Sequence, residues 1–131
     1  MNSKSLLILD KSKATIENDR YIFRFSTGIK LIKWKLRKFY TNNIEMSKLY
    51  CHIPELTRKT QSATLDGEGN PSDIIALVSD GKANDDNDRN TMFLNTPHKF
   101  HKLTVYFTNG EDNTAVALND FSVCLDIIRP N

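Results

Sequence analysis

Hydrophobic and polar residues alternate with a period of two along most of this sequence, which is the pattern of β-strands with one buried face. The clearest example is IKWKLR at residues 32–37, where apolar residues occupy one face and basic residues the other. Further strands are predicted over residues 21–25, 49–53, 102–107, 115–118 and 121–127, and a brief one over 91–94 that ends before Pro97. The continuous apolar run at 73–78 predicts a strand that is covered on both faces or tightly packed. Helical periodicity is nearly absent, so the chain is expected to be all-β.

Many short strands separated by turns favour an antiparallel two-sheet sandwich, a single jelly roll of about eight strands. At 131 residues the chain has the length of one domain, and we predict a single jelly-roll domain over residues 1–131. Residues 1–12 are expected to form an N-terminal arm or an edge strand. Two polar stretches, residues 57–72 and 80–90, are predicted to be long loops.

The apolar run Leu6 to Leu9 is too short for a signal-peptide core or a membrane span, so neither classical secretion nor a membrane partner is expected. Cys51 and Cys124 have no CxxC spacing. They are predicted to be free thiols in a protein made in a reducing compartment, with a cross-sheet disulfide as the alternative.

Charge is distributed unevenly along the chain. Up to Lys59 there are 13 basic and 5 acidic residues, whereas from Thr60 onward there are 5 basic and 11 acidic residues. Opposite charges gathered in different segments suggest contacts between copies or with a charged neighbour. The candidate interaction surface comprises the basic strand face Lys33, Lys35 and Arg37 and the acidic loop residues Asp85, Asp86 and Asp88. An ordinary solvated surface would explain each of these two groups equally well.

No sequence motif indicates catalysis, and no cofactor is predicted, because phosphate loops, nucleophile elbows and HExxH motifs are absent from the sequence. The loop at residues 80–88 has calcium-type oxygen ligands but lacks the glycine and closing glutamate of an EF-hand, so a solvated loop is preferred. His98 and His101 flank Phe100 without a third placed ligand, so no metal site is predicted.

Basic and aromatic residues are interleaved around Trp34, as in some proteins that bind single-stranded nucleic acids. However, alternation directs Trp34 to the face opposite Lys33 and Lys35, and the net charge of the chain is only +2. Trp34 is therefore expected in the core, and a nucleic acid is not the expected partner.

Two segments resemble a known group of proteins. Residues 20–44, RYIFRFSTGIKLIKWKLRKFYTNNI, and residues 102–128, KLTVYFTNGEDNTAVALNDFSVCLDII, are similar to the opening and closing strands of small jelly-roll proteins. These proteins belong to virophages, Polinton-like viruses and related eukaryotic double-stranded DNA viruses. The resemblance covers about half of the chain and consists mostly of core pattern.

The resemblance implies a non-enzymatic, capsid-associated or virion-surface protein: a minor capsid, penton-like, cement or spike-head unit. Its implied partners are copies of itself, as a trimer or pentamer, and other capsid proteins. Synthesis would then occur in the host cell cytoplasm, with the virion as the final location. The alternative is a TNF-like or carbohydrate-binding β-sandwich that recognises a receptor or glycan through residues 57–72 and 80–90.

Overall fold

The computed structural model describes residues 2–41, 48–60, 64–65, 68–69, 71–79, 82–84 and 92–130. Strands account for nearly all of its regular structure, and the prediction of an all-β protein is confirmed. The strands are β1 (Ser3–Asp10), β2 (Thr15–Glu17), β3 (Arg20–Thr41), β4 (Lys48–His52), β5 (Thr64–Leu65), β6 (Pro71–Ser72), β7 (Ile74–Ser79), β8 (Lys82–Asn84), β9 (Met92–Asn109), β10 (Ala115–Val116) and β11 (Phe121–Arg129). A 3-10 turn, Lys11–Lys13, and the helix α1, Pro54–Lys59, complete the described elements.

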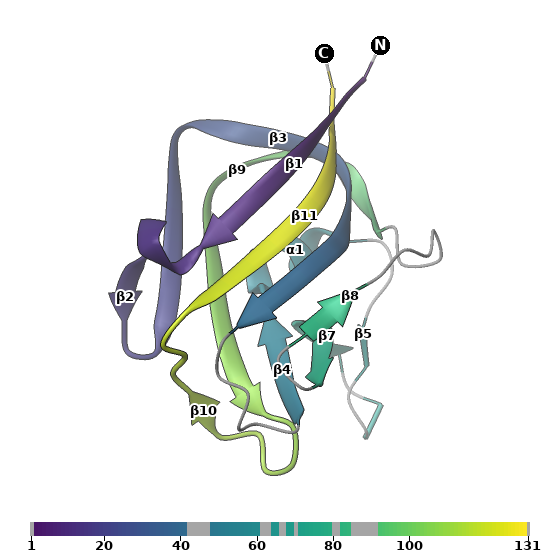
Figure 1. Ribbon diagram of the computed structural model, residues 1–131. Coiled ribbons are helices and arrows are strands. Elements are labelled where there is room, and N and C mark those ends of the chain that lie inside the picture. The colour runs from purple at the N-terminus through teal and green to yellow at the C-terminus, as the bar shows by residue number, and fades with distance from the viewer. Residues whose placement is uncertain are drawn as a thin grey trace.

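All pairings between the described strands are antiparallel. The main sheet has the order β1-β11-β3-β8-β7-β4-β9-β10, with β2 on β3 and an additional pairing between β3 and β9. Figure 1 shows β1, β11 and the second half of β3 as a layer in front of β9 and β4. The two chain ends lie side by side, because β1 pairs with β11 from Ser3 opposite Arg129.

Strands β3 and β9 are longer than the sequence pattern predicts, and each merges two predicted strands into one bent strand. In β3 the register with β9 shifts between Arg24 and Ile29, and Gly28 there has a φ of +76°, which glycine adopts without strain. The chain bends at this point without leaving the sheet. Pro97 does not end β9 as expected, because it falls within a second interruption of the ladder, between Leu31 and Lys33 of β3, and its missing N–H removes no ladder bond there.

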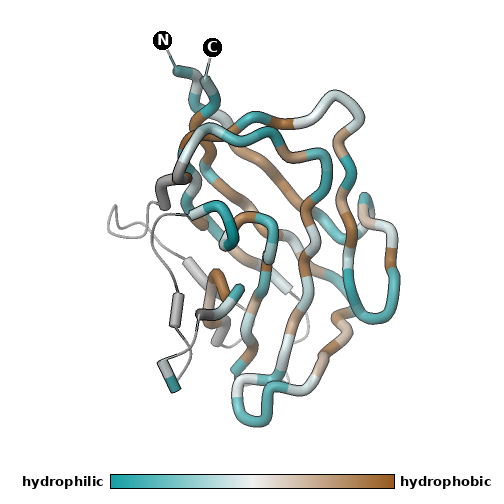
Figure 2. The backbone as a smooth tube through the Cα atoms, turned by 180° about the vertical axis from the view of Figure 1, so that it is seen from behind, coloured by the Kyte–Doolittle hydropathy of each residue, from teal (hydrophilic) through white to brown (hydrophobic). Residues whose placement is uncertain are grey.

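The hydrophobic core lies between the two layers and is rich in aromatic side chains. Phe121 is fully buried, and its ring centroid lies 4.7 Å from that of Tyr21 and 4.9 Å from that of Phe107. Leu9, Phe23, Trp34, Leu36, Leu49, Cys51, Ile53, Leu103, Val105, Val123, Leu125 and Ile127 are also buried. Figure 2 shows hydrophobic and hydrophilic positions alternating along the strands, as the sequence analysis expects. The prediction that Trp34 is a core residue is confirmed.

Two details differ from a simple pattern of one buried face. Alternation places Ile22 on the face opposite Tyr21 and Phe23, yet Ile22 is only 7% exposed, so both faces of this part of β3 are covered. Strand β7 was expected to be covered tightly, yet Leu77 is 53% exposed. A continuous apolar run therefore does not establish that both faces of a strand are covered.

Helix α1 was not predicted, since six residues are too few to show a helical period. Pro54 occupies its first turn, where the fixed φ of proline suits a helix and its missing N–H has no cost. Glu55 joins this helix to β9: its carboxylate accepts hydrogen bonds from the backbone N–H of Thr104 at 2.8 Å and from the hydroxyl of Thr104 at 2.7 Å. At the other end of the helix, the indole N–H of Trp34 donates to Thr60 Oγ1 at 3.2 Å.

Candidate protein interface

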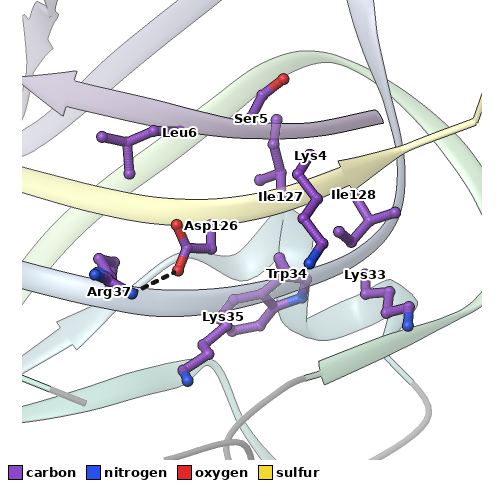
Figure 3. A pocket seen from close by; sticks show the side chains of 10 residues that line it. All are labelled: Lys4, Ser5, Leu6, Lys33, Trp34, Lys35, Arg37, Asp126, Ile127 and Ile128. Atoms are coloured by element: carbon purple, nitrogen blue, oxygen red, sulfur yellow. Dashed lines mark ion pairs between the residues drawn. The ribbon is translucent and has the colours of Figure 1, made fainter. Parts of the chain in front are cut away.

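A groove of about 770 Å³ runs along the outer face of the layer formed by β1, β11 and the second half of β3 (Figure 3). Strands from opposite ends of the chain build it. Its lining residues are Lys4, Ser5, Leu6, Lys33, Trp34, Lys35, Arg37, Asp126, Ile127 and Ile128.

Strand register explains which of these side chains become neighbours. Lys35 of β3 lies opposite Asp126 of β11, and Asp126 lies opposite Leu6 of β1. One step along the same face, Lys33 lies opposite Ile128, and Ile128 lies opposite Lys4. Since cross-strand neighbours on one face are close enough to interact, basic, acidic and apolar side chains are interspersed on this face.

The groove carries more positive than negative charge. Its described lining includes four basic side chains, Lys4, Lys33, Lys35 and Arg37, against the single carboxylate of Asp126. The Arg37 guanidinium lies 3.5 Å from the Asp126 carboxylate, and the two side chains are 57% and 43% exposed (Figure 3). An ion pair this exposed contributes little to stability. The surplus of positive charge would attract an acidic partner.

The apolar part of this face lies on β1. Leu6 is 53% exposed and Ile8 is 56% exposed, and both follow Lys4 along the outer face of the strand. Large apolar side chains grouped at a surface mark contact sites more often than single exposed ones do.

The structure brings together the three basic residues of the predicted interaction surface, Lys33, Lys35 and Arg37. Asp85, Asp86 and Asp88 lie outside the described residues. Of the two loops on which the alternative receptor- or glycan-binding function depends, residues 80–90 are described only at 82–84. The described part of residues 57–72 includes the end of α1 and the short strands β5 and β6, so the prediction of one long loop there is wrong. Sequence reasoning missed Lys4, Leu6 and Ile8, because only the pairing of β1 with β11 brings the N-terminal segment onto the same face as Lys33, Lys35 and Arg37. The exposed apolar residues at alternate positions of β1 were the available signal.

A second polar cluster joins β4, β7 and β9 on the other layer. The imidazole of His52 lies between Asp73 Oδ1, 2.5 Å from Nδ1, and Thr108 Oγ1, 2.8 Å from Nε2. The Tyr106 ring stacks on His52 with a centroid distance of 4.3 Å, and its hydroxyl donates to Asp73 Oδ2 at 2.6 Å. The Arg20 guanidinium lies over the Tyr106 ring, 4.0 Å from the ring centroid.

The cluster perturbs two ionisable groups. Burial acts to raise the pKa of Asp73, but the hydrogen bonds from Tyr106 and His52 outweigh it and hold that pKa below its ordinary value. Burial and the neighbouring Asp73 carboxylate raise the pKa of Tyr106 to about 12. Because ionised Asp73 only accepts hydrogen bonds, the Nδ1 atom of His52 carries the hydrogen between them.

In some hydrolases a histidine held between a carboxylate and a hydroxyl acts as the general base that activates the hydroxyl as a nucleophile. In this protein, however, Thr108 is 7% exposed and His52 is 4% exposed, so the hydroxyl is shielded from a substrate. We interpret the cluster as a hydrogen-bond network that ties β4, β7 and β9 together.

The remaining candidate residues, two cysteines and a histidine, do not lie together in one site. Cys51 is buried and Cys124 half-buried, both are free thiols, and burial raises the pKa of each. His101 faces the backbone carbonyl of Phe25, with Nδ1 at 3.4 Å from the oxygen. Within the described ranges, no three His, Cys, Asp or Glu side chains are placed to hold a metal ion.

Comparisons with known proteins give no family assignment. No family model matches the sequence, and no curated protein matches it significantly. Among the described residues, no helix has the length and apolar character needed to cross a membrane.

Proposed function

We propose that this protein is a non-enzymatic structural unit, a jelly-roll sandwich that acts in a virus particle through self-assembly and contacts with other capsid proteins. The observation that carries the proposal is the outer face of β1, β11 and β3, where a basic groove lies beside exposed apolar side chains. The three features that the function needs are a rigid core, an attractive contact face and a defined charge pattern on that face.

The rigid core comes from close packing of aromatic side chains between the layers. Phe121 contacts Tyr21 and Phe107 edge to face, an arrangement that aromatic rings prefer. A subunit with such a core presents its outer strands in a constant geometry, which repeated assembly requires.

The contact face combines an apolar part with a charged part. Removing Leu6 and Ile8 from water would supply affinity, while the basic side chains Lys33, Lys35 and Arg37 would favour a partner with acidic groups. The sequence from Thr60 onward, with 11 acidic and 5 basic residues, makes another copy of the same chain a suitable partner.

The assignment to a virus particle depends on the family resemblance of residues 20–44 and 102–128. Their described parts are β3 and the stretch from the second half of β9 through β11. Arg20 to Arg24 of β3 pairs with this half of β9, and Lys33 to Thr41 pairs with β11. The two resembling segments therefore form one hydrogen-bonded unit of the fold.

The test measures self-association of the full chain by light scattering and sedimentation over a range of protein and salt concentrations. The double variant Lys33→Glu and Lys35→Glu should weaken association, and the wild-type complex should dissociate as salt screens the charges. Lys102→Glu is the matched control, since this exposed lysine lies on β9, away from the groove.

A wild-type chain that remains monomeric at the highest attainable concentration would overturn the proposal. Binding of an oligonucleotide that is lost in the double variant, without any self-association, would instead assign the basic groove to nucleic acid.

A further inference from the structure

Strand β1 is an edge of the main sheet among the described residues. It pairs with β11 along its whole length, from Ser3 to Asp10, without a register shift. Every second residue of such a strand directs its N–H and C=O groups away from the sheet. Natural edges are usually protected by a bulge, a proline or closely spaced charges. Here Leu6 and Ile8 stand at the centre of the strand and are more than half exposed, so the edge is open to another strand.

We propose that β1 of one copy pairs antiparallel with β1 of a second copy, with Leu7 on the two-fold axis. The inference rests on the proposed function, because it names one contact between copies, separate from the one that Lys33 and Lys35 of β3 would make. In this register Leu6 lies opposite Ile8 of the second copy, and Lys4 lies opposite Asp10 of the second copy. The two-fold axis repeats each pair, so the contact contains two apolar pairs and two pairs of opposite charge.

The outer face of β1 selects this register. Lys4, Leu6, Ile8 and Asp10 alternate with inward residues, so a slip of one position would place outward residues opposite inward ones. A slip of two in one direction places Leu6 opposite itself and Lys4 opposite Ile8. A slip of two in the other direction places Ile8 opposite itself and Leu6 opposite Asp10. Only the register centred on Leu7 places apolar residues opposite apolar residues and also places the basic residue opposite the acidic one.

Asp10, the acidic residue of the proposed charge pair, is held by hydrogen bonds within its own chain. Asp10 accepts hydrogen bonds from the backbone N–H of Ser12 at 3.1 Å, from the Ser12 hydroxyl at 2.5 Å and from the Ser122 hydroxyl at 2.5 Å. These bonds keep the pKa of Asp10 below its ordinary value, so its charge persists at neutral pH. Lys4 is exposed and can reach across the strand boundary.

The same contact would also bury apolar surface on the inner face of β1. Leu7 packs against the core but remains half-buried, while its neighbour Leu9 is 1% exposed. Leu7 of the second copy would cover the remaining exposed surface of Leu7. The two sheets would then continue across the axis as β11-β1-β1-β11. Such a contact closes at two copies, in contrast to the trimer or pentamer that the family resemblance implies.

Cysteine cross-linking tests the register directly. Two proteins are prepared in a Cys124→Ser background, one with Leu6→Cys and the other with Ile8→Cys. The background change is needed because Cys124 lies opposite Ile8 within the chain. Directly opposed residues of an antiparallel pair have Cα atoms about 4.5–5.5 Å apart, within the range of about 4.4–6.8 Å that disulfides bridge, whereas diagonal neighbours lie about 7–8 Å apart. Oxidation of the mixture should therefore give a Leu6→Cys/Ile8→Cys heterodimer, with little dimer from either protein alone.

Ile16→Cys provides the matched control, since Ile16 is also 56% exposed but lies on β2. Its mixture with Leu6→Cys should remain uncross-linked. Disulfide dimers of Leu6→Cys alone, or of Ile8→Cys alone, would overturn the proposed register. A mixture that stays uncross-linked while the wild type associates would overturn the β1 contact and leave the proposed function standing. A wild type that never associates would overturn both.

Discussion

Replacing Asp73 with alanine tests the importance of the network that joins β4, β7 and β9. The substitution removes the acceptor of two hydrogen bonds, from His52 Nδ1 and from the Tyr106 hydroxyl. His52 is 4% exposed, so water does not easily replace its lost hydrogen-bond partner. Tyr106 is half-buried, so water can partly replace the acceptor that its hydroxyl loses. A buried polar group left without a partner costs about 1–3 kcal/mol. We therefore expect Asp73→Ala to lower the free energy of unfolding by about 2–4 kcal/mol.

This loss converts into a measurable shift in the melting temperature. Unfolding entropy is about 2.1 cal/mol/K per residue, which for this chain amounts to about 0.28 kcal/mol/K at the midpoint. The expected fall in Tm is therefore about 7–15 °C, measured by circular dichroism or calorimetry. Asp73→Asn should lose much less, because its amide can accept from Tyr106 and donate to the other tautomer of His52. Equal Tm values for Asp73→Ala and the wild type would refute the assignment of a stabilising role to this network.

The pH dependence provides an independent check on the same carboxylate. Because the folded-state pKa of Asp73 lies below its ordinary value of 3.8, its charge stabilises the folded protein above that pH. The stabilisation should disappear as the pH falls through the lowered pKa. The difference in stability between the wild type and Asp73→Asn should therefore shrink in acid. A difference that stays constant down to the lowest pH at which both proteins fold would contradict this mechanism.

Three further outcomes are expected. Leu125→Asp should prevent folding, seen as loss of the β-type circular dichroism spectrum, because it places a carboxylate at a position that is fully buried. A thiol reagent added to the folded protein should modify Cys124 slowly and Cys51 only after denaturation, since Cys51 is 1% exposed and burial raises its pKa; rapid modification of both would contradict the core assignment. Gly28→Ala should lower Tm by several degrees, roughly 1 kcal/mol or more, because the residue has a positive φ and a Cβ atom would lie 2.8 Å from the Lys99 side chain.

The alternation of apolar and polar residues was sufficient to predict an all-β protein and much of its core. Trp34, Val105 and Leu125 are buried as expected, because a regular strand turns alternate side chains to opposite faces and burial of one face follows from hydrophobicity alone. The pattern also grouped Lys33, Lys35 and Arg37 on one surface. These are local properties that need no knowledge of which strands are neighbours.

Only the tertiary structure decided how the strands combine. The sequence suggested breaks near Gly28 and Pro97, yet β3 and β9 continue through both, because each residue falls where the ladder between the two strands is interrupted. The polar network arose in the same way: His52 and Thr108 are 56 residues apart and meet only because β4 pairs with β9. Period-two alternation states which face a residue occupies but not which strand lies beside it. Pairing between distant strands depends on the packing of the whole chain, and it alone placed β1 next to β11, where its outer face adjoins the basic groove.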